Sequence, residues 1–259
     1  MRYFLCLSYD GADFCGWQVQ PRSPSVQACL EAALSRLLNR PVAVTGAGRT
    51  DTGVHASGYV AHFDTDGPLP YEAADFAYKL NAILPRSISV SSLSPVADEL
   101  HARFSARRRE YTYFIHRKKD PFVRNYSWLC GYPDLDFGAM NAACAALLGT
   151  HDFSCFEKTG GDNKTSLCTV YDAFWKPYVP SHVAVLEAPG ASDGDYWYFR
   201  IAADRFLRNM VRATVGTLIE VGRGKHRPEW VAGLIASGSR GDAGESVPGH
   251  ALFLNKVLY

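Results

Sequence analysis

The sequence predicts an α+β protein built of two halves, each with a mainly antiparallel sheet. Stretches rich in strand formers alternate with stretches whose apolar residues recur at helical spacing. The connections between them include hairpin lengths as well as longer crossovers. With 259 residues, 47% of them hydrophobic and 20% charged, the chain has the composition of an ordinary globular protein and is long enough for two compact halves.

The first half is expected to span residues 1–105. The stretch "RYFLCLSYD" predicts a strand that ends at the turn signal Asp10-Gly11. Apolar residues between Ser25 and Leu38 follow one helical face, and Ser23-Pro24 marks its start. The further elements expected in this half are strands at 42–45, 58–63 and 87–93 and a helix at 71–84.

The second half is expected to span residues 106–259. It opens with the alternating stretch "RREYTYFIHRK", which predicts a strand with Tyr111, Tyr113 and Ile115 on one face. An apolar stripe from Leu207 to Ile219 predicts a helix that ends at Gly222. The remaining expected elements are helices at 136–149 and 228–238 and strands at 168–178, 195–203 and 251–259.

Several function classes find no support in the composition. The chain has no apolar run long enough to span a bilayer, and Asp10 comes too early for the apolar region of a signal peptide, so we expect a cytoplasmic protein. Seven cysteines without a C-x-x-C pair predict reduced, mostly buried thiols, and no Cys/His spacing fits a metal site. We therefore expect no metal.

The net charge of +1 is small, but arginines gather beside aromatics in "HARFSARRREYTYFIHRKK" and "RFLRNMVR". Such clusters occur where RNA phosphates and bases are bound, and they also occur on solvated surfaces.

The stretch "GAGRTDTGVHA", residues 46–56, places one carboxylate, Asp51, in a turn rich in glycine. It begins like a dinucleotide-binding fingerprint, but Asp51 stands at the third glycine and a strand follows instead of a helix. A second pattern, "GASDG" at 190–194, has the form of a hydrolase nucleophile elbow, yet a strand follows it as well. The alternative role for Asp51 is structural, because an aspartate in a glycine-rich turn commonly bonds its own backbone amides.

This stretch resembles the catalytic motif of the tRNA pseudouridine synthase A family. Four more stretches resemble the family in the same order along the chain: "YDGADFCGWQVQP", "HARFSARRREYTY", "RFLRNMVRATVGTLIEVGRGK" and "HALFLNKVLY". The resemblance implies two α+β halves whose sheets join into one platform with a catalytic cleft between them. It also implies a homodimer that converts uridine to pseudouridine at positions 38, 39 and 40 in the anticodon arm of tRNA, without a cofactor.

The resemblance also implies the site residues. Asp51 matches the essential aspartate, and Arg212 in "MVR" matches the arginine that partners it. Arg49 matches a residue thought to hold the flipped nucleotide, although a simple phosphate contact is the alternative. Tyr111 matches the active-site tyrosine, whose ring can stack on uracil while the base turns.

The chemistry explains why an acid is needed. Isomerisation breaks the bond between C1′ and N1, turns the base and joins C5 to C1′, and a carboxylate can stabilise or capture the electron-poor sugar. Whether Asp51 attacks C1′ or removes the 2′ proton stays open, and either role requires the ionised form. A non-catalytic RNA-binding module is the alternative function.

The chain departs from the family pattern in a few places. Tyr59 stands where glutamine is usual, and Val247, Gly249 and Ala251 replace common residues near the end, which we expect to affect packing more than chemistry. The stretch 176–194 is longer than usual.

Overall fold

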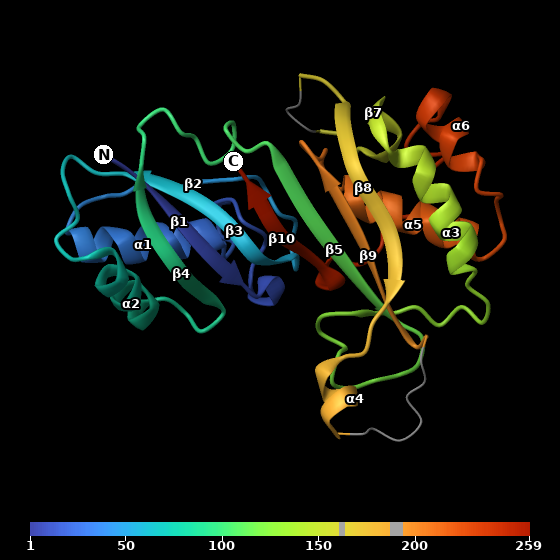
Figure 1. The fold of residues 1–259 in the computed structure, drawn as a ribbon. Coiled ribbons are helices and arrows are strands. Elements are labelled where there is room, and N and C mark those ends of the chain that lie inside the picture. Colours follow the sequence, from blue (N-terminus) through green and yellow to red (C-terminus); the bar gives the residue numbers. More distant parts are fainter. Residues whose placement is uncertain (161–163, 187–193) are drawn as a thin grey trace. The chain divides into compact units, whose positions relative to one another are not determined.

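The computed structural model describes residues 1–160, 164–186 and 194–259, and the chain folds into two compact units (Figure 1). The first unit contains Met1–Arg109 and Phe253–Tyr259, and the second contains Glu110–Leu252. The predicted division after residue 105 placed the final strand in the second half, whereas that strand groups with the first unit. A compact unit is not yet a domain that folds alone, so the domain division stays a prediction.

The first unit is a sheet with helices packed against it. Its strand order is β4-β1-β3-β10, with β2 paired to β3; β1 is antiparallel to β3 and β4, and β10 is parallel to β3. The two helices α1 and α2 contribute the buried residues Val26, Leu30, Leu34, Phe76 and Leu80. The elements are β1 (Arg2–Tyr9), α1 (Val26–Leu38), β2 (Thr45–Gly46), β3 (His55–Asp64), α2 (Ala73–Ile83), β4 (Ile88–Val96) and β10 (Leu252–Leu258), with the 3-10 turn η1 (Gly11–Asp13).

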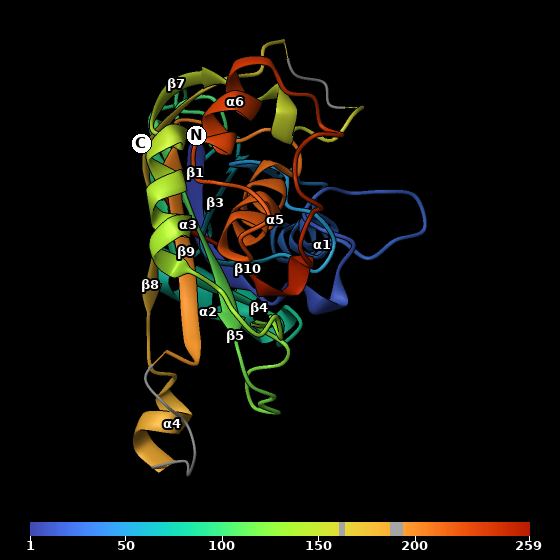
Figure 2. The same cartoon turned by 90° about the vertical axis from the view of Figure 1, so that its right-hand side faces the viewer.

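The second unit has a sheet of order β5-β9-β8-β7, with β6 parallel to β5. The strand β8 is antiparallel to both β7 and β9, and α3 packs against α5 and β8. The short helix α4 buries none of its residues and projects away from the other helices of the unit (Figure 2). The strands and helices are β5 (Arg108–His116), β6 (Trp128–Leu129), α3 (Phe137–Cys144), β7 (Gly149–Asp152), β8 (Leu167–Pro177), α4 (Ser181–Leu186), β9 (Tyr196–Ala203), α5 (Met210–Gly222) and α6 (Trp230–Ser237), with 3-10 turns at Ala145–Leu147, Ser154–Phe156 and Gly249–Ala251.

The α+β class with mainly antiparallel pairing is confirmed, and so are all of the expected helices. The strand expected at 42–45 is wrong in extent, because the strand β2 is limited to Thr45–Gly46. Side chains of α1 take the preceding backbone groups: Ser35 Oγ accepts from the Val42 amide at 2.9 Å, and Glu31 Oε1 accepts from the Val44 amide at 3.0 Å. An amide bonded to a helix side chain is not available for a strand ladder.

The helix α4 was not expected, and it lies within the long stretch 176–194. Residues 187–193 of that stretch lie outside the described residues. The start of the "GASDG" pattern falls there too. The strand β9 does follow the pattern, which agrees with the argument against a nucleophile elbow.

The helix α5 depends on a glycine that faces a neighbouring backbone. A Cβ atom built on Gly216 would lie 1.7 Å from the carbonyl oxygen of Glu245. The Gly244 amide donates to Thr217 Oγ1 at 2.9 Å, which keeps the segment before Pro248 on the helix. No side chain fits between this segment and α5 without displacing one of them.

We therefore expect Gly216→Ala to lower the free energy of unfolding by about 1 to 3 kcal/mol, because the added methyl group overpacks the contact. Alanine normally favours a helix interior over glycine by about 1 kcal/mol. Gly233→Ala on α6 is the matched control, since a Cβ there meets nothing within 4 Å, and it should raise stability. Urea denaturation measures both changes. Equal stabilisation by the two substitutions would contradict the tight packing at Gly216.

Candidate functional site

The loop between β2 and β3, residues 47–54, carries both Arg49 and Asp51, and we call it the aspartate loop. Its two ends are held together by the sheet, because the Ala47 amide donates to the Val60 carbonyl at 2.9 Å. A turn follows the acid, with the Val54 amide donating to the Asp51 carbonyl at 3.1 Å and Gly53 at a φ of 74°. Asp51 is half-buried and Arg49 is exposed. The sequence prediction that the acid lies on a loop between two strands is confirmed.

Two glycines of the segment after β1 let its backbone touch the aspartate loop. A Cβ on Gly16, which has a φ of 92°, would lie 2.2 Å from the Thr50 carbonyl oxygen, and one on Gly11 would lie 2.1 Å from the Val54 carbonyl oxygen. Trp17 donates its amide to the Thr50 carbonyl at 3.3 Å. These contacts explain why glycine occupies positions 11 and 16 next to the loop.

Two tyrosine hydroxyls fix the aspartate loop from the sheet side. Tyr9 on β1 bonds Thr50 Oγ1 through its hydroxyl at 2.8 Å. Tyr59 on β3 is fully buried, stacks on Trp17 at a ring distance of 4.1 Å, and donates to the Gly48 carbonyl. We expected Tyr59 to affect packing. The structure adds that its hydroxyl holds the loop at Gly48, the residue directly before Arg49.

His55 begins β3 directly after the aspartate loop and is 1% exposed. Its Nδ1 accepts from the Gly11 amide at 3.0 Å, and its ring stacks on Phe253 at 4.6 Å. These contacts fix His55 at the end of the aspartate loop.

Arg109 also supports the aspartate loop, and sequence reasoning missed this role. Its guanidinium donates to the carbonyl oxygen of Ala47 at 2.9 Å and to that of Arg103 at 2.6 Å. The arginine-rich run around it had suggested phosphate contacts, but these bonds to backbone carbonyls are structural. The one signal in the sequence was the resemblance of the surrounding stretch to the family.

Tyr111 lies on β5 in the second unit and is 9% exposed. Its ring meets the ring of Phe206 edge-on at 5.0 Å. Tyr113 and Ile115 are fully buried, as expected for the same face. Thr112 on the opposite face is buried too, so β5 is covered on both faces at this point.

Arg212 lies in the first turn of α5, also in the second unit. Its Nε donates to the Val247 carbonyl at 2.7 Å, and its own carbonyl accepts from the Val247 amide at 3.3 Å. Tyr113 secures the next residue, because its hydroxyl donates to the Pro248 carbonyl at 3.0 Å. At position 247 the bonds to Arg212 are therefore made by backbone atoms.

The four predicted site residues thus form two pairs. Asp51 and Arg49 share the aspartate loop of the first unit, while Tyr111 and Arg212 lie on β5 and α5 of the second.

The cysteines are all within the described residues, and all seven are free thiols. Four of them are buried, and burial raises the pKa of Cys130 and Cys155 to about 11 and that of Cys144 to about 12. Such thiols stay protonated and unreactive near neutral pH. Across residues 1–160, 164–186 and 194–259, no cluster of three metal-binding side chains and no helix able to cross a bilayer is present.

Comparison with known proteins gives the same family for nearly the whole chain. A family described as tRNA pseudouridine synthase matches residues 5–105 and 143–259. The tRNA pseudouridine synthase A of Parabacteroides distasonis is 46% identical over 259 residues, which are 100% of this chain and 96% of that protein. The protein of the same name from Exiguobacterium sp. is 40% identical and covers 100% of this chain and 98% of its own length. The chain belongs to the tRNA pseudouridine synthase family.

Proposed function

We propose that this chain isomerises uridine to pseudouridine at positions 38, 39 and 40 in the anticodon arm of tRNA, with Asp51 as the catalytic carboxylate. Membership of the family makes the chain a tRNA pseudouridine synthase, an isomerase. The three positions come from the family resemblance of its motifs. The observation that carries the role of Asp51 is its place on a loop held by Gly16, Tyr9 and Tyr59, because catalysis needs a carboxylate held in one position.

The reaction needs no atom from outside. The bond between C1′ and N1 of uracil breaks, the base turns, and C5 bonds to C1′ while the C5 proton is lost and N1 gains a proton. Asp51 either attacks C1′ as a nucleophile or removes the 2′ proton, and both steps begin with the carboxylate ionised. A target base within a paired arm has to leave its stack first, at a cost of a few kcal/mol.

The other site residues have supporting roles in this proposal. Arg49, exposed on the aspartate loop, holds the flipped nucleotide or its phosphate. Tyr111 stacks on the uracil through both glycosidic steps. Arg212 stabilises the ionised acid, and its Nε bond to Val247 fixes the direction of its side chain. A homodimer in the cytoplasm completes the proposal. A module that only binds RNA would not need a carboxylate fixed among groups that contact phosphates.

Asp51→Asn should abolish isomerisation and leave tRNA affinity roughly unchanged, because an amide of the same shape can neither attack C1′ nor take a proton. The measurement is tritium release from tRNA labelled at C5 of uridine, which should fall by at least about a thousandfold. The control is Asp75→Asn, an exposed acid on α2. Turnover retained in Asp51→Asn would remove the acid from the mechanism.

Tyr111→Phe and Tyr111→Leu separate stacking from the hydroxyl group. If the ring stacks on the base, phenylalanine keeps most of the activity and leucine lowers kcat/KM by about 5- to 150-fold. Steady-state kinetics on one tRNA substrate give the comparison, with circular dichroism to verify the fold. A leucine variant as active as the phenylalanine variant would show that stacking is not what Tyr111 contributes.

Tyr59→Phe tests whether the position of the aspartate loop limits the rate. The substitution removes the hydroxyl that donates to Gly48, so the loop loses one of its two tyrosine supports. We expect the single-turnover rate to fall by about 3- to 30-fold. The control is Tyr71→Phe, where the tyrosine is 45% exposed. An unchanged rate in Tyr59→Phe would mean that the remaining contacts fix the loop alone.

A further inference from the structure

The segment 101–107 of the first unit, which we call the arginine-phenylalanine loop, has a backbone fixed by side chains. The His101 ring nitrogen Nδ1 accepts from the amides of Arg103 and Phe104 at 3.1 and 3.2 Å. Ser105 closes the turn, with its Oγ accepting from the His101 amide at 2.9 Å and its amide donating to the His101 carbonyl at 2.9 Å. The loop therefore has one conformation set by its own residues.

Neighbouring elements hold the same loop in place. The His62 Nδ1 on β3 accepts from the Ala102 amide at 3.1 Å, and the Tyr259 hydroxyl donates to the Ala102 carbonyl at 2.7 Å. Burial lowers the pKa of His62 to about 4, which keeps this ring neutral and able to accept. Such contacts on the backbone leave the side chains of Arg103 and Phe104 outside.

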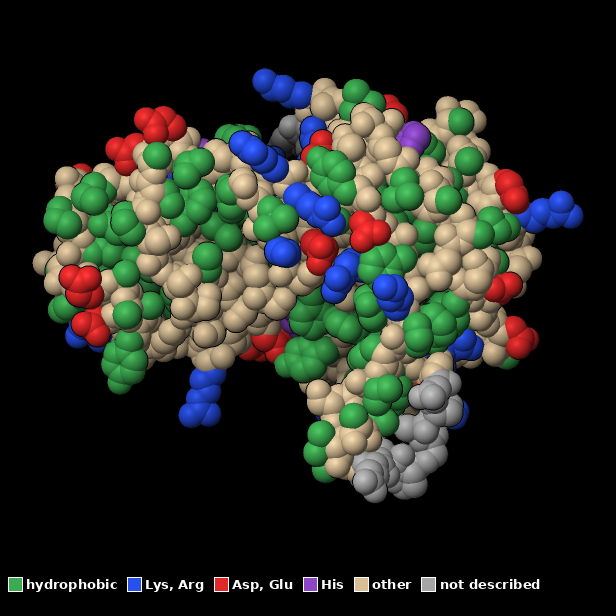
Figure 3. Space-filling view, in the orientation of Figure 1, with side chains coloured by type: hydrophobic (Ala, Val, Ile, Leu, Met, Phe, Trp, Pro, Cys, Tyr) green, Lys and Arg blue, Asp and Glu red, His purple; other side chains and the backbone are tan. Residues whose placement is uncertain are grey.

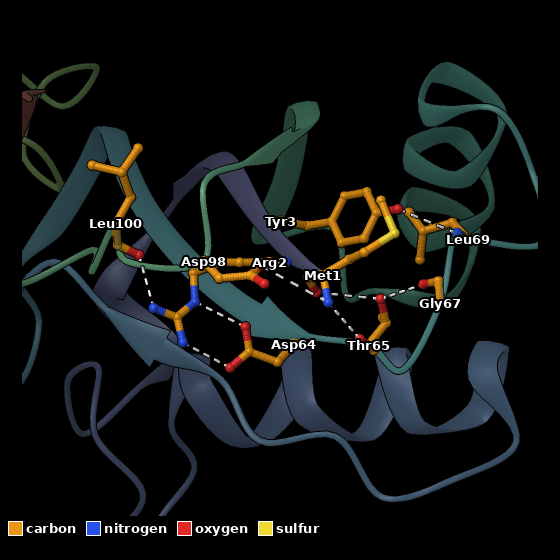
Figure 4. Close-up of polar contacts among 9 residues, drawn as sticks. All are labelled: Met1, Arg2, Tyr3, Asp64, Thr65, Gly67, Leu69, Asp98 and Leu100. Carbon is orange, nitrogen blue, oxygen red and sulfur yellow. Dashed lines mark hydrogen bonds and ion pairs between the residues drawn. The ribbon is translucent and has the colours of Figure 1, made fainter.

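The residues that lead into the loop are anchored as well (Figure 4). Arg2 forms two bonds of 2.8 Å with the carboxylate of Asp64 and donates to the Leu100 carbonyl at 2.9 Å. The Arg2 amide donates to Asp98 Oδ1 at 3.0 Å. The loop thus starts from a fixed point on β1.

Two exposed side chains project from this fixed backbone. The Phe104 side chain is 76% exposed, so its ring is open to a ligand. The His101 ring lies 4.4 Å from its ring centre, and the Arg103 guanidinium lies 5.5 Å from it. An exposed aromatic ring beside an arginine is the combination that binds unpaired bases and their phosphates.

A hollow in the surface connects this loop with the aspartate loop. It is lined by Arg103, Gln18, Gln27 and Trp17 together with Gly48 and Arg49. The Arg109 guanidinium joins the two loops directly through the carbonyls of Ala47 and Arg103. Two arginines from separate loops therefore line one hollow.

The overall charge of the chain would not identify this hollow as a phosphate-binding site. In Figure 3 the basic side chains near the middle of the face drawn are interspersed with acidic ones, and the net charge is only +1. A local pair of guanidinium groups is then the feature that attracts a phosphate.

We propose that one nucleotide of the RNA next to the target uridine binds here, with its phosphate in the hollow between Arg49 and Arg103 and its base outside the hollow, stacked on Phe104 beside Arg103. The inference rests on the proposed function and adds a second contact site to it. Because the arginine-phenylalanine loop is fixed before RNA binds, the contact orders few protein groups and sets the position of the strand relative to Asp51.

Phe104→Ala tests the stacking. Binding is measured in the Asp51→Asn background, so that no product forms, with an anticodon-arm RNA as probe. Loss of a stacked base should weaken affinity by about 5- to 150-fold. The matched control is Tyr78→Ala, which is also 76% exposed but lies on α2 and not on the arginine-phenylalanine loop. It should bind like the parent protein.

Arg103→Gln tests the phosphate. Affinity should fall, and the slope of log affinity against log salt should decrease by about 0.7 to 0.9, the value for one phosphate contact. Arg86→Gln, an exposed arginine away from the hollow lining, should leave the slope unchanged.

The outcomes separate the two proposals. If wild type releases tritium and both hollow variants bind like their controls, the nucleotide site is wrong and the proposed function stands. If the Phe104 and Arg103 variants lose affinity but wild type releases no tritium from unmodified tRNA, the proposed reaction at positions 38, 39 and 40 is wrong and the RNA contact stands.

Discussion

The site depends on one close approach between two backbones. The segment after β1 touches the aspartate loop at Gly11 and Gly16, where any side chain would collide with a carbonyl oxygen of the loop. This approach blocks movement of the loop toward the segment, and it brings the Trp17 amide within reach of the Thr50 carbonyl. The carboxylate therefore lies on an irregular segment that a neighbouring backbone supports. That constraint suits a reaction in which the acid has to meet a sugar carbon at one position.

Around this contact, most of the supporting bonds end on backbone atoms. Tyr59 bonds Gly48, Arg109 bonds Ala47, and Arg212 bonds Val247 through carbonyl oxygens. A carbonyl is present whatever side chain its residue carries, so the supported positions tolerate exchange more easily than the supporting ones. Tyr59 is one of the supporting residues, through its stacking on Trp17 and its bond to Gly48.

The arginine-phenylalanine loop combines a bonded backbone with exposed side chains, and this combination connects the fold with the proposed RNA contact. The arginine-phenylalanine loop has its amides and carbonyls bonded by His101, His62, Arg109 and Tyr259, while its arginine and phenylalanine face outward. Arg109 also bonds the aspartate loop, so a strand held at one loop is placed relative to the other. The histidines take part as neutral acceptors, which explains why two of them can pack edge to face at 4.8 Å without repulsion.

The sequence by itself determined the α+β class, the helices, most strands and the place of Asp51 between two strands, because these follow from local periodicity and turn residues. The motifs, which occur in the family's order along the chain, also identified the family and the four candidate residues. Tertiary structure alone decided which bonds hold them. The shortening of β2 arises from side chains of α1 that lie 7 and 13 residues earlier in the chain than the amides they bind, and the structural role of Arg109 arises from a carbonyl 62 residues away. Sequence patterns report the preferences of residues that are close together along the chain, whereas these bonds join residues that only folding brings together.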